Sequence, residues 1–245
     1  MELIGHRGQR IPDGPPENTV ASVNTALAAG AEGVEVDVRL TADGVVVCLH
    51  DPDLLRVTGS ADLVRQLTYE ELRRIPLANG DAIPRLEDVA DVVRGRGLLV
   101  VEVKHDPVDR RTIAASVVGV LQRSGLGDRV VFSSFSSRLL EQAARLRPRL
   151  RRALVTGPDL PAAVGLCRAV AAGHAELHAH VRTVLADHEI ADQARQRGCR
   201  LRCWTVNREV DARLLAVAGV ASFITDNPST LRSALSRGPM EPSAR

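Results

Sequence analysis

Charged residues recur at a two-residue spacing in two apolar segments of this sequence. Glu35 and Asp37 alternate with valines in the segment 34–40, so both point to the face opposite the valines. Glu102 lies in a second valine-rich segment and shares its face with Lys104. If helices cover the valine face, the carboxylates point inward, where unpaired charges are costly. Three such oxygens suit one hard divalent cation, Mg²⁺ or Ca²⁺.

The same carboxylates also have a purely structural interpretation. In this arrangement Lys104 and Arg7 lie near enough to pair with them, and buried charge networks of this kind occur in proteins without any catalytic function. The spacing alone does not decide between a metal site and an ion network, so both interpretations remain open at this stage.

A turn motif follows the first carboxylate segment. Asp43-Gly44 separates it from a second β-rich segment that ends at His50, and the gap is too short for a parallel crossover. Asp-Gly is typical of a two-residue hairpin turn. With Asp43 and Gly44 as the turn residues, Asp37 lies opposite His50. We therefore predict that the strand continues as an antiparallel hairpin, which returns His50 beside the carboxylates.

His6 and Arg7 end the first apolar segment, and a neighbouring strand end places them beside Glu35. Two imidazoles flanking a metal suit acid-base chemistry on a phosphate ester: Arg7 and Lys104 bind anionic oxygens, while His6 and His50 move protons. The other histidines are expected to be ordinary polar residues: His105, His174, His178, His180 and His188.

Short apolar segments alternate with helical patterns, which predicts βα units around a parallel sheet. The expected strands are 3–5, 33–38, 98–103, 130–133, 153–155, 175–177, 200–204 and 222–225. The expected helices are 19–29, 86–94, 111–124, 137–147, 161–172, 185–196, 208–217 and 229–235. This α/β pattern predicts a single (β/α)8 TIM-type barrel over residues 1–236, with its chemistry at the carboxyl ends of the strands and a flexible tail at 237–245.

Length and composition agree with one folded domain. The chain has 245 residues, near the ~250 typical of such a barrel, and 44% of them are hydrophobic. Lys and Arg number 32 against 30 Asp and Glu, and aromatic residues make up only 2%, so nucleic-acid binding is not expected. No apolar segment reaches the ~18 residues of a membrane span.

The N-terminal residues and the cysteines point to a reducing compartment. Polar side chains stand where a secretory signal would need an apolar segment, so a cytoplasmic location is expected. The cysteines form no C-x-x-C pair and are expected to be buried thiols: Cys48, Cys167, Cys199 and Cys203.

The helix expected at 19–29 has recognisable ends. Either Asn18 or Thr19 is expected to cap its start, and Gly30 to end it.

Together these motifs resemble the glycerophosphodiester phosphodiesterase family. They match in order and spacing over nearly the whole chain, which is far more specific than any single motif. The matching motifs are His6-Arg7-Gly8, Pro16-Glu17-Asn18-Thr19, Glu35-x-Asp37, Leu40-Thr41-x-Asp43-Gly44, His50-Asp51-Pro52, Ile83-Pro84-x-Leu86-Glu87-Asp88-Val89, Glu102-x-Lys104, Trp204-Thr205-Val206-Asn207 and Thr225-Asp226-x-Pro228.

The resemblance implies a barrel whose site is capped by a small insertion at about residues 53–82. It implies one divalent cation, held by the same three carboxylates, and His6 and His50 as the catalytic pair. The implied reaction is hydrolysis of a glycerophosphodiester to an alcohol and glycerol 3-phosphate. In it the substrate's 2-hydroxyl attacks phosphorus, one histidine takes its proton, the other protonates the leaving alcohol, and water opens the cyclic phosphate.

The resemblance also suggests roles for residues around the pocket. Glu17 is expected to orient groups at the rim, and Trp204 either forms the floor of the glycerol pocket or only packs at a strand end. Asn207 is interpreted as the cap of the following helix. The segment 175–182 departs from the family pattern, with Glu-Leu-His-Ala-His in place of a Val-Asn-Pro ending. This departure affects the pocket wall, so the sequence does not determine which head group the substrate carries.

Two alternatives to this function are kept. One is a lysophospholipase D-like phosphodiesterase on longer lipids, although the sequence offers no apolar loop suited to bilayer insertion. The other is a metal- or ligand-binding barrel without turnover, which would have no need of two proton carriers. The expected partner is a small phosphodiester substrate, with no nucleic acid and no stable membrane insertion. The oligomeric state is left open.

Overall fold

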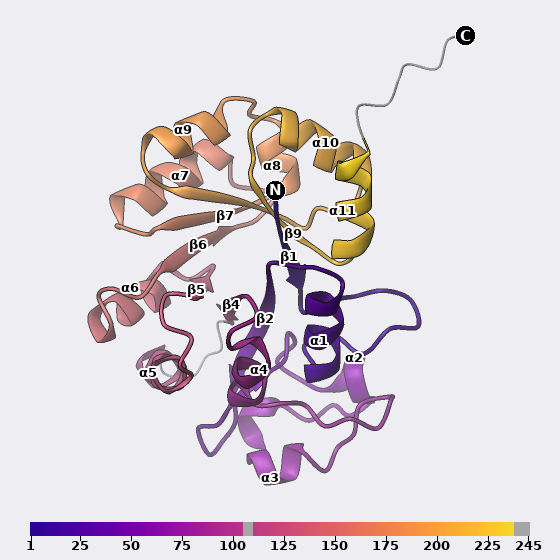
Figure 1. The fold of residues 1–245 in the computed structure, drawn as a ribbon. Helices are drawn as coiled ribbons and strands as arrows, with labels where there is room; N and C mark the ends of the chain where they lie inside the picture. Colours follow the sequence, from indigo (N-terminus) through magenta and orange to yellow (C-terminus); the bar gives the residue numbers. More distant parts are fainter. Residues whose placement is uncertain (105–109, 238–245) are drawn as a thin grey trace.

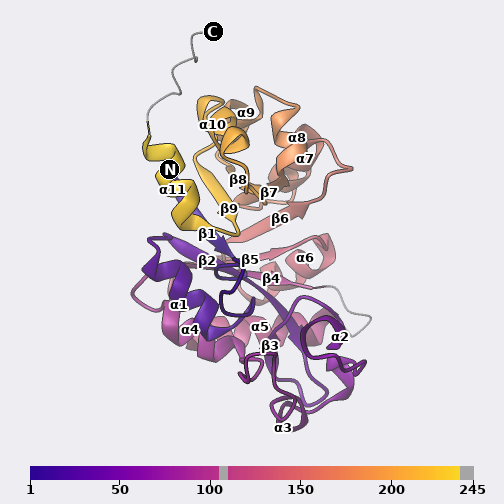
Figure 2. The same cartoon turned by 90° about the vertical axis from the view of Figure 1, so that its right-hand side faces the viewer.

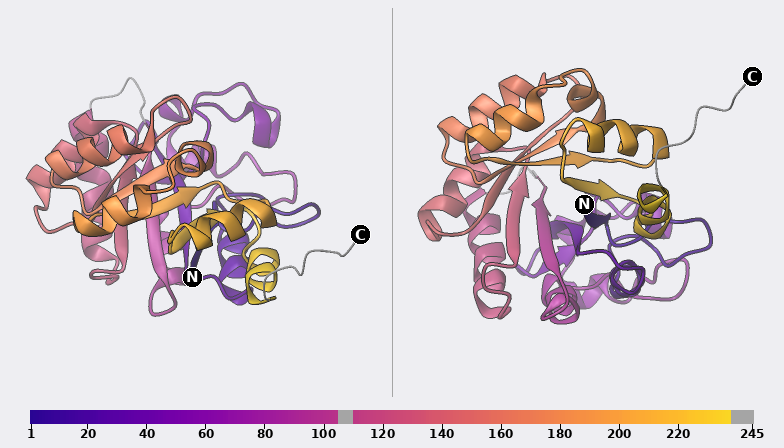
Figure 3. Two further views of the ribbon diagram at one scale, coloured as in Figure 1. Left: turned by 90° about the horizontal axis from the view of Figure 1, so that it is seen from above. Right: turned by 45° about the horizontal axis from the view of Figure 1, so that its top comes forward.

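The computed structural model describes residues 1–104 and 110–237 of this chain. Parallel strands pair around a closed ring in the order β1-β9-β8-β7-β6-β5-β4-β2, and β1 pairs with β2 to close it. The ring strands are β1 (Glu2–His6), β2 (Gly33–Leu40), β4 (Leu98–Val103), β5 (Val130–Ser134), β6 (Arg152–Thr156), β7 (Glu176–His180), β8 (Arg200–Trp204) and β9 (Ser222–Thr225). The predicted TIM-type barrel is thereby confirmed (Figures 1 and 3).

Helices lie around the outside of this ring, as Figure 1 shows. They are α1 (Val20–Ala28), α4 (Leu86–Val93), α5 (Arg110–Arg123), α6 (Ser137–Leu146), α7 (Ala162–Ala171), α8 (Val181–Leu185), α9 (Ile190–Gln196), α10 (Glu209–Val217) and α11 (Pro228–Ser236). Most predicted boundaries are right to within one or two residues. The single helix expected at 185–196 is wrong, because α8 starts directly after β7 and ends before α9 begins.

Strand β7 explains that difference. It runs to His180, three residues past its expected end, because the alternation continues and buries Leu177 and Ala179 in the core shared with the helices. The His180 imidazole then accepts a hydrogen bond from the backbone N–H of Arg182, 3.2 Å away, and caps α8 at its first turn. His178 and its even-numbered neighbours consequently face the barrel interior.

Strand β2 divides its side chains between core and interior as the alternation predicts. Val34, Val36 and Val38 are fully buried in the cluster that includes apolar residues of the surrounding helices. The barrel interior below the site holds a separate apolar cluster: Ile4, Leu98, Val100, Val131, Ala153 and Ile224. Glu35 and Asp37 therefore stand on the interior face.

The hairpin forms, but in a different register from the predicted one. Strand β3 (Val46–Cys48) pairs antiparallel with β2, and the backbone N–H of Thr41 donates to the carbonyl of Val45 at 3.0 Å. This pairing leaves three loop residues instead of two, with Gly44 at φ +82° in the left-handed region. The predicted pairing of Asp37 with His50 is wrong by one residue, because Leu49 stands opposite Asp37.

The segment after β3 folds as three short helical turns: α2 (Leu55–Thr58), the 3-10 helix η1 (Val64–Gln66) and α3 (Tyr69–Leu72). Figure 2 shows α2 and α3 close to β3 on one side of the barrel. The segment packs around its own apolar cluster, made of Val47, Leu49, Leu54, Val64, Leu72, Leu77 and Ile83. These three turns lie within residues 53–82, the range expected for the insertion.

Several smaller expectations have mixed outcomes. Cys48, Cys199 and Cys203 are buried, as expected, whereas Cys167 is exposed because it lies on the outer face of α7. Of the expected tail only Arg237 is described; the rest of it and His105 lie outside the described residues.

Among the helices of residues 1–104 and 110–237, none combines the length and apolar character that a membrane crossing requires.

Candidate active site

The carboxyl ends of the barrel strands surround a cavity of about 130 Å³. Its lining contains most of the residues expected to do chemistry and several that were not expected. The lining residues are His6, Arg7, Glu35, His50, Glu102, Lys104, Ser133, Phe135, Val155, His178, Trp204 and Ile224. Although the predicted hairpin register is wrong by one residue, His50 lies beside the carboxylates at this cavity, as predicted.

Glu35, Asp37 and Glu102 converge beside this cavity. One oxygen of each carboxylate lies within 4.8 Å of the others. The Oε2 atom of Glu35 accepts a hydrogen bond from the backbone N–H of Arg7 at 3.0 Å. Its other oxygen, Oε1, is buried and has no hydrogen-bond partner among the described residues. A buried carboxylate oxygen without a partner is costly, so this atom is suited to a cation.

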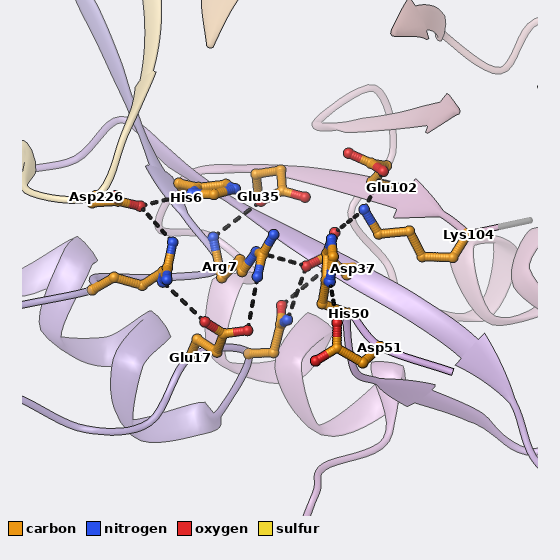
Figure 4. A network of polar contacts seen from close by, with 12 residues as sticks. His6, Arg7, Glu17, Glu35, Asp37, His50, Asp51, Glu102, Lys104 and Asp226 are labelled. Atoms are coloured by element: carbon orange, nitrogen blue, oxygen red, sulfur yellow. Dashed lines mark hydrogen bonds and ion pairs between the residues drawn. The ribbon is translucent and has the colours of Figure 1, made fainter. Parts of the chain in front are cut away.

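Asp37 is the most heavily contacted of the three carboxylates (Figure 4). Lys104 Nζ lies 2.7 Å from Oδ1, and Arg7 Nε lies 2.9 Å from Oδ2. The Asn18 side chain donates to Oδ2 and accepts from the backbone N–H of Asp37, both at 3.0 Å. Asn18 is thus committed to the site, and Thr19 caps α1 instead.

The pKa shifts of the three carboxyls differ because their partners differ. Burial and the like charges of Asp37 and Glu102 raise the pKa of Glu35 well above its ordinary range. Burial also raises the pKa of Glu102, although Lys104 opposes this. Burial has the same tendency at Asp37, but the cations Lys104 and Arg7 outweigh it and lower the pKa of that carboxyl.

The ion network therefore explains only part of the cluster. Lys104 pairs with both Asp37 and Glu102, and Arg7 pairs with Asp37, but neither cationic side chain pairs with Glu35. One more cation among the three carboxylates would pair with Glu35 Oε1 and offset the burial and the like charges that raise the pKa of this carboxyl. The residues present fit a hard divalent ion with oxygen ligands.

His6 is oriented by a carboxylate from the other end of the chain. Its Nδ1 lies 2.6 Å from Asp226 Oδ1, in the loop after β9. Asn207 donates to Asp226 Oδ2 at 2.6 Å and accepts from the Asp226 backbone N–H at 2.9 Å. The expected helix-capping role of Asn207 is wrong, because its side chain is used here and α10 starts at Arg208 without a side-chain cap.

His50 is oriented in the same way by the residue that follows it. Its Nδ1 lies 2.7 Å from Asp51 Oδ1, and Arg56 Nε donates to Asp51 Oδ2 at 2.6 Å. The side chain of Arg39 donates to the His50 carbonyl through Nε at 2.8 Å and Nη2 at 2.6 Å. Burial lowers the pKa of His50, and the nearby Asp37 charge offsets part of this effect.

Glu17, which was expected to orient groups at the rim, forms ion pairs with three arginines there. Its carboxylate lies 2.8 Å from Arg7 Nη1, 2.9 Å from Arg10 Nε and 2.6 Å from Arg56 Nη2. Arg10 also contacts Asp226 at 3.4 Å. Glu17 thereby connects the surroundings of both histidines, whose carboxylate partners appear beside it in Figure 4.

The aromatic side of the cavity is built on Trp204. The ring of Phe135 meets it edge to face with centroids 5.7 Å apart, and the ring of His180 does so at 5.2 Å. The indole Nε1 donates to the carbonyl of His178 at 3.2 Å. Trp204 therefore forms a fixed wall, and both Phe135 and Trp204 face the cavity.

Some of these residues were missed by sequence reasoning. Asn18, Asp51 and Asp226 belong to motifs that match the family, but none of them was expected to act in the site, and Asn18 was considered only as a helix cap. Arg10 and Phe135 belong to no such motif, and their place follows only from the fold.

Comparison with known proteins identifies the family of this chain. The model of the glycerophosphoryl diester phosphodiesterase family matches residues 6–230. A glycerophosphodiester phosphodiesterase from Caldanaerobacter subterraneus subsp. tengcongensis is 29% identical over 244 residues, covering 96% of this chain and 98% of the relative. One from Bacillus altitudinis is 30% identical, covering 93% and 95%.

Solved structures show the same fold. A phosphodiesterase from Oleispira antarctica, in complex with the product sn-glycerol-3-phosphate, superposes with a TM-score of 0.87 at 27% identity and 97% coverage of both chains. A glycerophosphodiester phosphodiesterase from Parabacteroides distasonis gives 0.85 at 27% identity, with 97% of this chain and 98% of that chain covered. The chain belongs to the glycerophosphoryl diester phosphodiesterase family and is an enzyme of the phosphodiesterase class.

Proposed function

We propose that this enzyme hydrolyses glycerophosphodiesters to an alcohol and glycerol 3-phosphate, with one divalent cation, Mg²⁺ or Ca²⁺, held by Glu35, Asp37 and Glu102. The observation that carries the proposal is the buried, unpartnered Glu35 Oε1 beside two further carboxylates. The cavity next to it also holds two imidazoles. The Oleispira relative, with sn-glycerol-3-phosphate bound, supports the product class.

The phosphate would bind on the β1, β2 and β4 side of the cavity. A cation held there supplies Lewis-acid stabilisation of the charge that develops on the phosphoryl oxygens. Arg7 and Lys104 line the same cavity, and each is already held in place by Asp37. Their positive charges bind and orient the phosphate oxygens.

The two histidines would transfer the protons of the reaction. Because Nδ1 of each ring faces a carboxylate, Nε2 is the nitrogen left for substrate. In the first step the 2-hydroxyl forms the new bond to phosphorus and gives its proton to one imidazole. The bond to the leaving alcohol breaks, and the other imidazole protonates that oxygen. Water then opens the cyclic phosphate, and both histidines return to their starting protonation states.

The metal requirement is tested with glycerophosphocholine as substrate and glycerol 3-phosphate as the measured product. Chelation with EDTA should abolish turnover, and Mg²⁺ or Ca²⁺ should restore it. Glu35→Gln should lower kcat/KM by about 10²-fold or more, since even outer-shell partners of a metal cost up to this amount. Glu70→Gln, at an exposed position on α3, is the matched control. Undiminished turnover by Glu35→Gln in EDTA would contradict the metal site.

The attacking group is tested with a change of substrate. A dialkyl phosphate that lacks a hydroxyl next to the phosphate should be a very poor substrate, because the intramolecular nucleophile is missing. Equal turnover of the dialkyl phosphate and glycerophosphocholine would show that water attacks directly. It would leave the proposed metal site unaffected.

A further inference from the structure

His178 faces the cavity from the side opposite the proposed phosphate site. In the ring order, β1, β9 and β8 separate β2 from β7 in one direction, and β4, β5 and β6 separate them in the other. Figure 1 accordingly shows β7 and β2 on opposite sides of the barrel. A substrate group that crosses the interior from a phosphate beside Glu35 therefore meets the β7 side of the cavity.

His178 also lies deeper than the aromatic wall. In the β7–β8 register His180 stands beside Trp204, while His178 stands one interior layer below, beside Arg202. Its side chain is only 2% exposed, yet it lines the cavity. Val155 and Ile224, which line the cavity near His178, have no polar side-chain atoms. Among these three residues, only His178 can form a hydrogen bond through its side chain.

The hydrogen bond of His178 defines which of its nitrogens is free. Nε2 lies 3.1 Å from Glu176 Oε2, and the same oxygen accepts from Arg202 Nε at 2.7 Å. Since the ionised carboxylate can only accept, the imidazole must donate from Nε2. Nδ1 has no partner among the described residues, and in this tautomer it is a hydrogen-bond acceptor.

We propose that His178 Nδ1 accepts a hydrogen bond from the terminal hydroxyl of the glycerol moiety, the one remote from the phosphate. This inference rests on the proposed function. It makes His178 a specificity-determining residue, because the deep end of the pocket then requires a free hydroxyl. An ester at that oxygen, as in a lysophospholipid, removes the donor and needs an acyl chain to fit beside a nearly buried ring.

The inference is tested with two substrates that differ in this hydroxyl only. Both glycerophosphocholine and propane-1,2-diol phosphocholine keep the hydroxyl next to the phosphate, but the second lacks the terminal one. The wild-type enzyme should show a kcat/KM about tenfold to a hundredfold lower for the second compound, since it leaves the buried acceptor unpaired. His178→Ala should lose activity on the first compound only, so the ratio should fall toward one.

Two further variants separate recognition from structure. His178→Gln keeps an amide donor for Glu176 and a carbonyl acceptor for substrate, so it should restore part of the discrimination. His188→Ala, at an exposed position between α8 and α9, should keep the wild-type ratio. The wild-type comparison needs no variant and stands even if His178→Ala is unstable.

The outcomes distinguish this inference from the function on which it rests. Equal kcat/KM of the wild-type enzyme for both compounds overturns the role of His178 and leaves the proposed reaction intact. Wild-type discrimination retained in a folded His178→Ala variant overturns it as well. Failure to cleave either compound in the presence of Mg²⁺ or Ca²⁺ contradicts the proposed function itself.

Discussion

His6 and His50 come from distant parts of the sequence but are held by the same device. Each ring presents Nδ1 to a carboxylate, Asp226 at 2.6 Å and Asp51 at 2.7 Å, which leaves Nε2 as the nitrogen available to substrate. The surroundings differ, because the His6 side chain is 12% exposed and that of His50 35%. A carboxylate in this position fixes the tautomer and stabilises the imidazolium that forms during proton transfer.

Asp226→Asn is therefore expected to lower kcat by about 10²–10⁴-fold, the range over which general acid-base catalysis contributes. The amide keeps the shape but loses the charge, so substrate binding and KM should change little. The measurement is steady-state kinetics on glycerophosphocholine. Asp159→Asn, at an exposed rim position, is the matched control. A kcat within twofold of the wild-type value would show that His6 needs no carboxylate partner.

At the scale of the element, strand β2 shows what alternation can predict. The two-residue period correctly placed Glu35, Asp37 and Arg39 on one face, because the valines between them had to meet the helices. The turn register was not predictable in the same way. Asp43-Gly44 is compatible with a two- or a three-residue loop, and the choice depends on which residues adopt the left-handed conformation.

Long-range partners were also beyond the sequence pattern. Asp226 follows the last strand and reaches His6 on the first only because the ring closes through β1 and β9. His178 could not be distinguished from other histidines, since its position depends on a strand that runs past its expected end.

Arg39 is the residue through which β2 positions the end of the hairpin. It is 6% exposed, and two of its N–H groups hold the His50 carbonyl. Arg39→Lys keeps the charge but loses this two-point contact. A displacement of about 1 Å at a catalytic group can cost up to ~10² in rate, so kcat/KM should fall about tenfold to a hundredfold. Kinetics well below the unfolding temperature test this, and a wild-type rate would show that β3 alone positions His50.

At the scale of the whole molecule, the barrel interior holds a second group of charges, which touches the cavity lining through the contact of Glu176 with His178. Arg202 is fully buried and lies 2.5 Å from Glu2 Oε2, 2.6 Å from Ser222 Oγ and 2.7 Å from Glu176 Oε2. These contacts join β1, β7, β8 and β9. They connect the first strand to strands some 200 residues later, so the cluster helps to close the ring.

This cluster makes stability depend on pH with a definite sign. Burial opposes ionisation of Glu176, but the contacts with His178 and Arg202 outweigh it and lower the pKa of the carboxyl in the folded state. Its contribution is therefore complete above the ordinary pKa of 4.5 and is lost as the pH falls below that value. The free energy of unfolding should accordingly decrease as the pH falls from about 5 to about 3.

Glu176→Gln should remove that contribution. At pH 7 it should lower the free energy of unfolding by about 3 to 5 kcal/mol, because it breaks a buried ion pair and leaves Arg202 with less compensating charge. Urea titrations followed by circular dichroism should show the gap between variant and wild type narrowing toward pH 3. Glu141→Gln, in an exposed pair on α6, should change stability by less than about 1 kcal/mol. A gap that stays constant over this pH range would mean that Glu176 is not an ionised partner of Arg202 in the folded barrel.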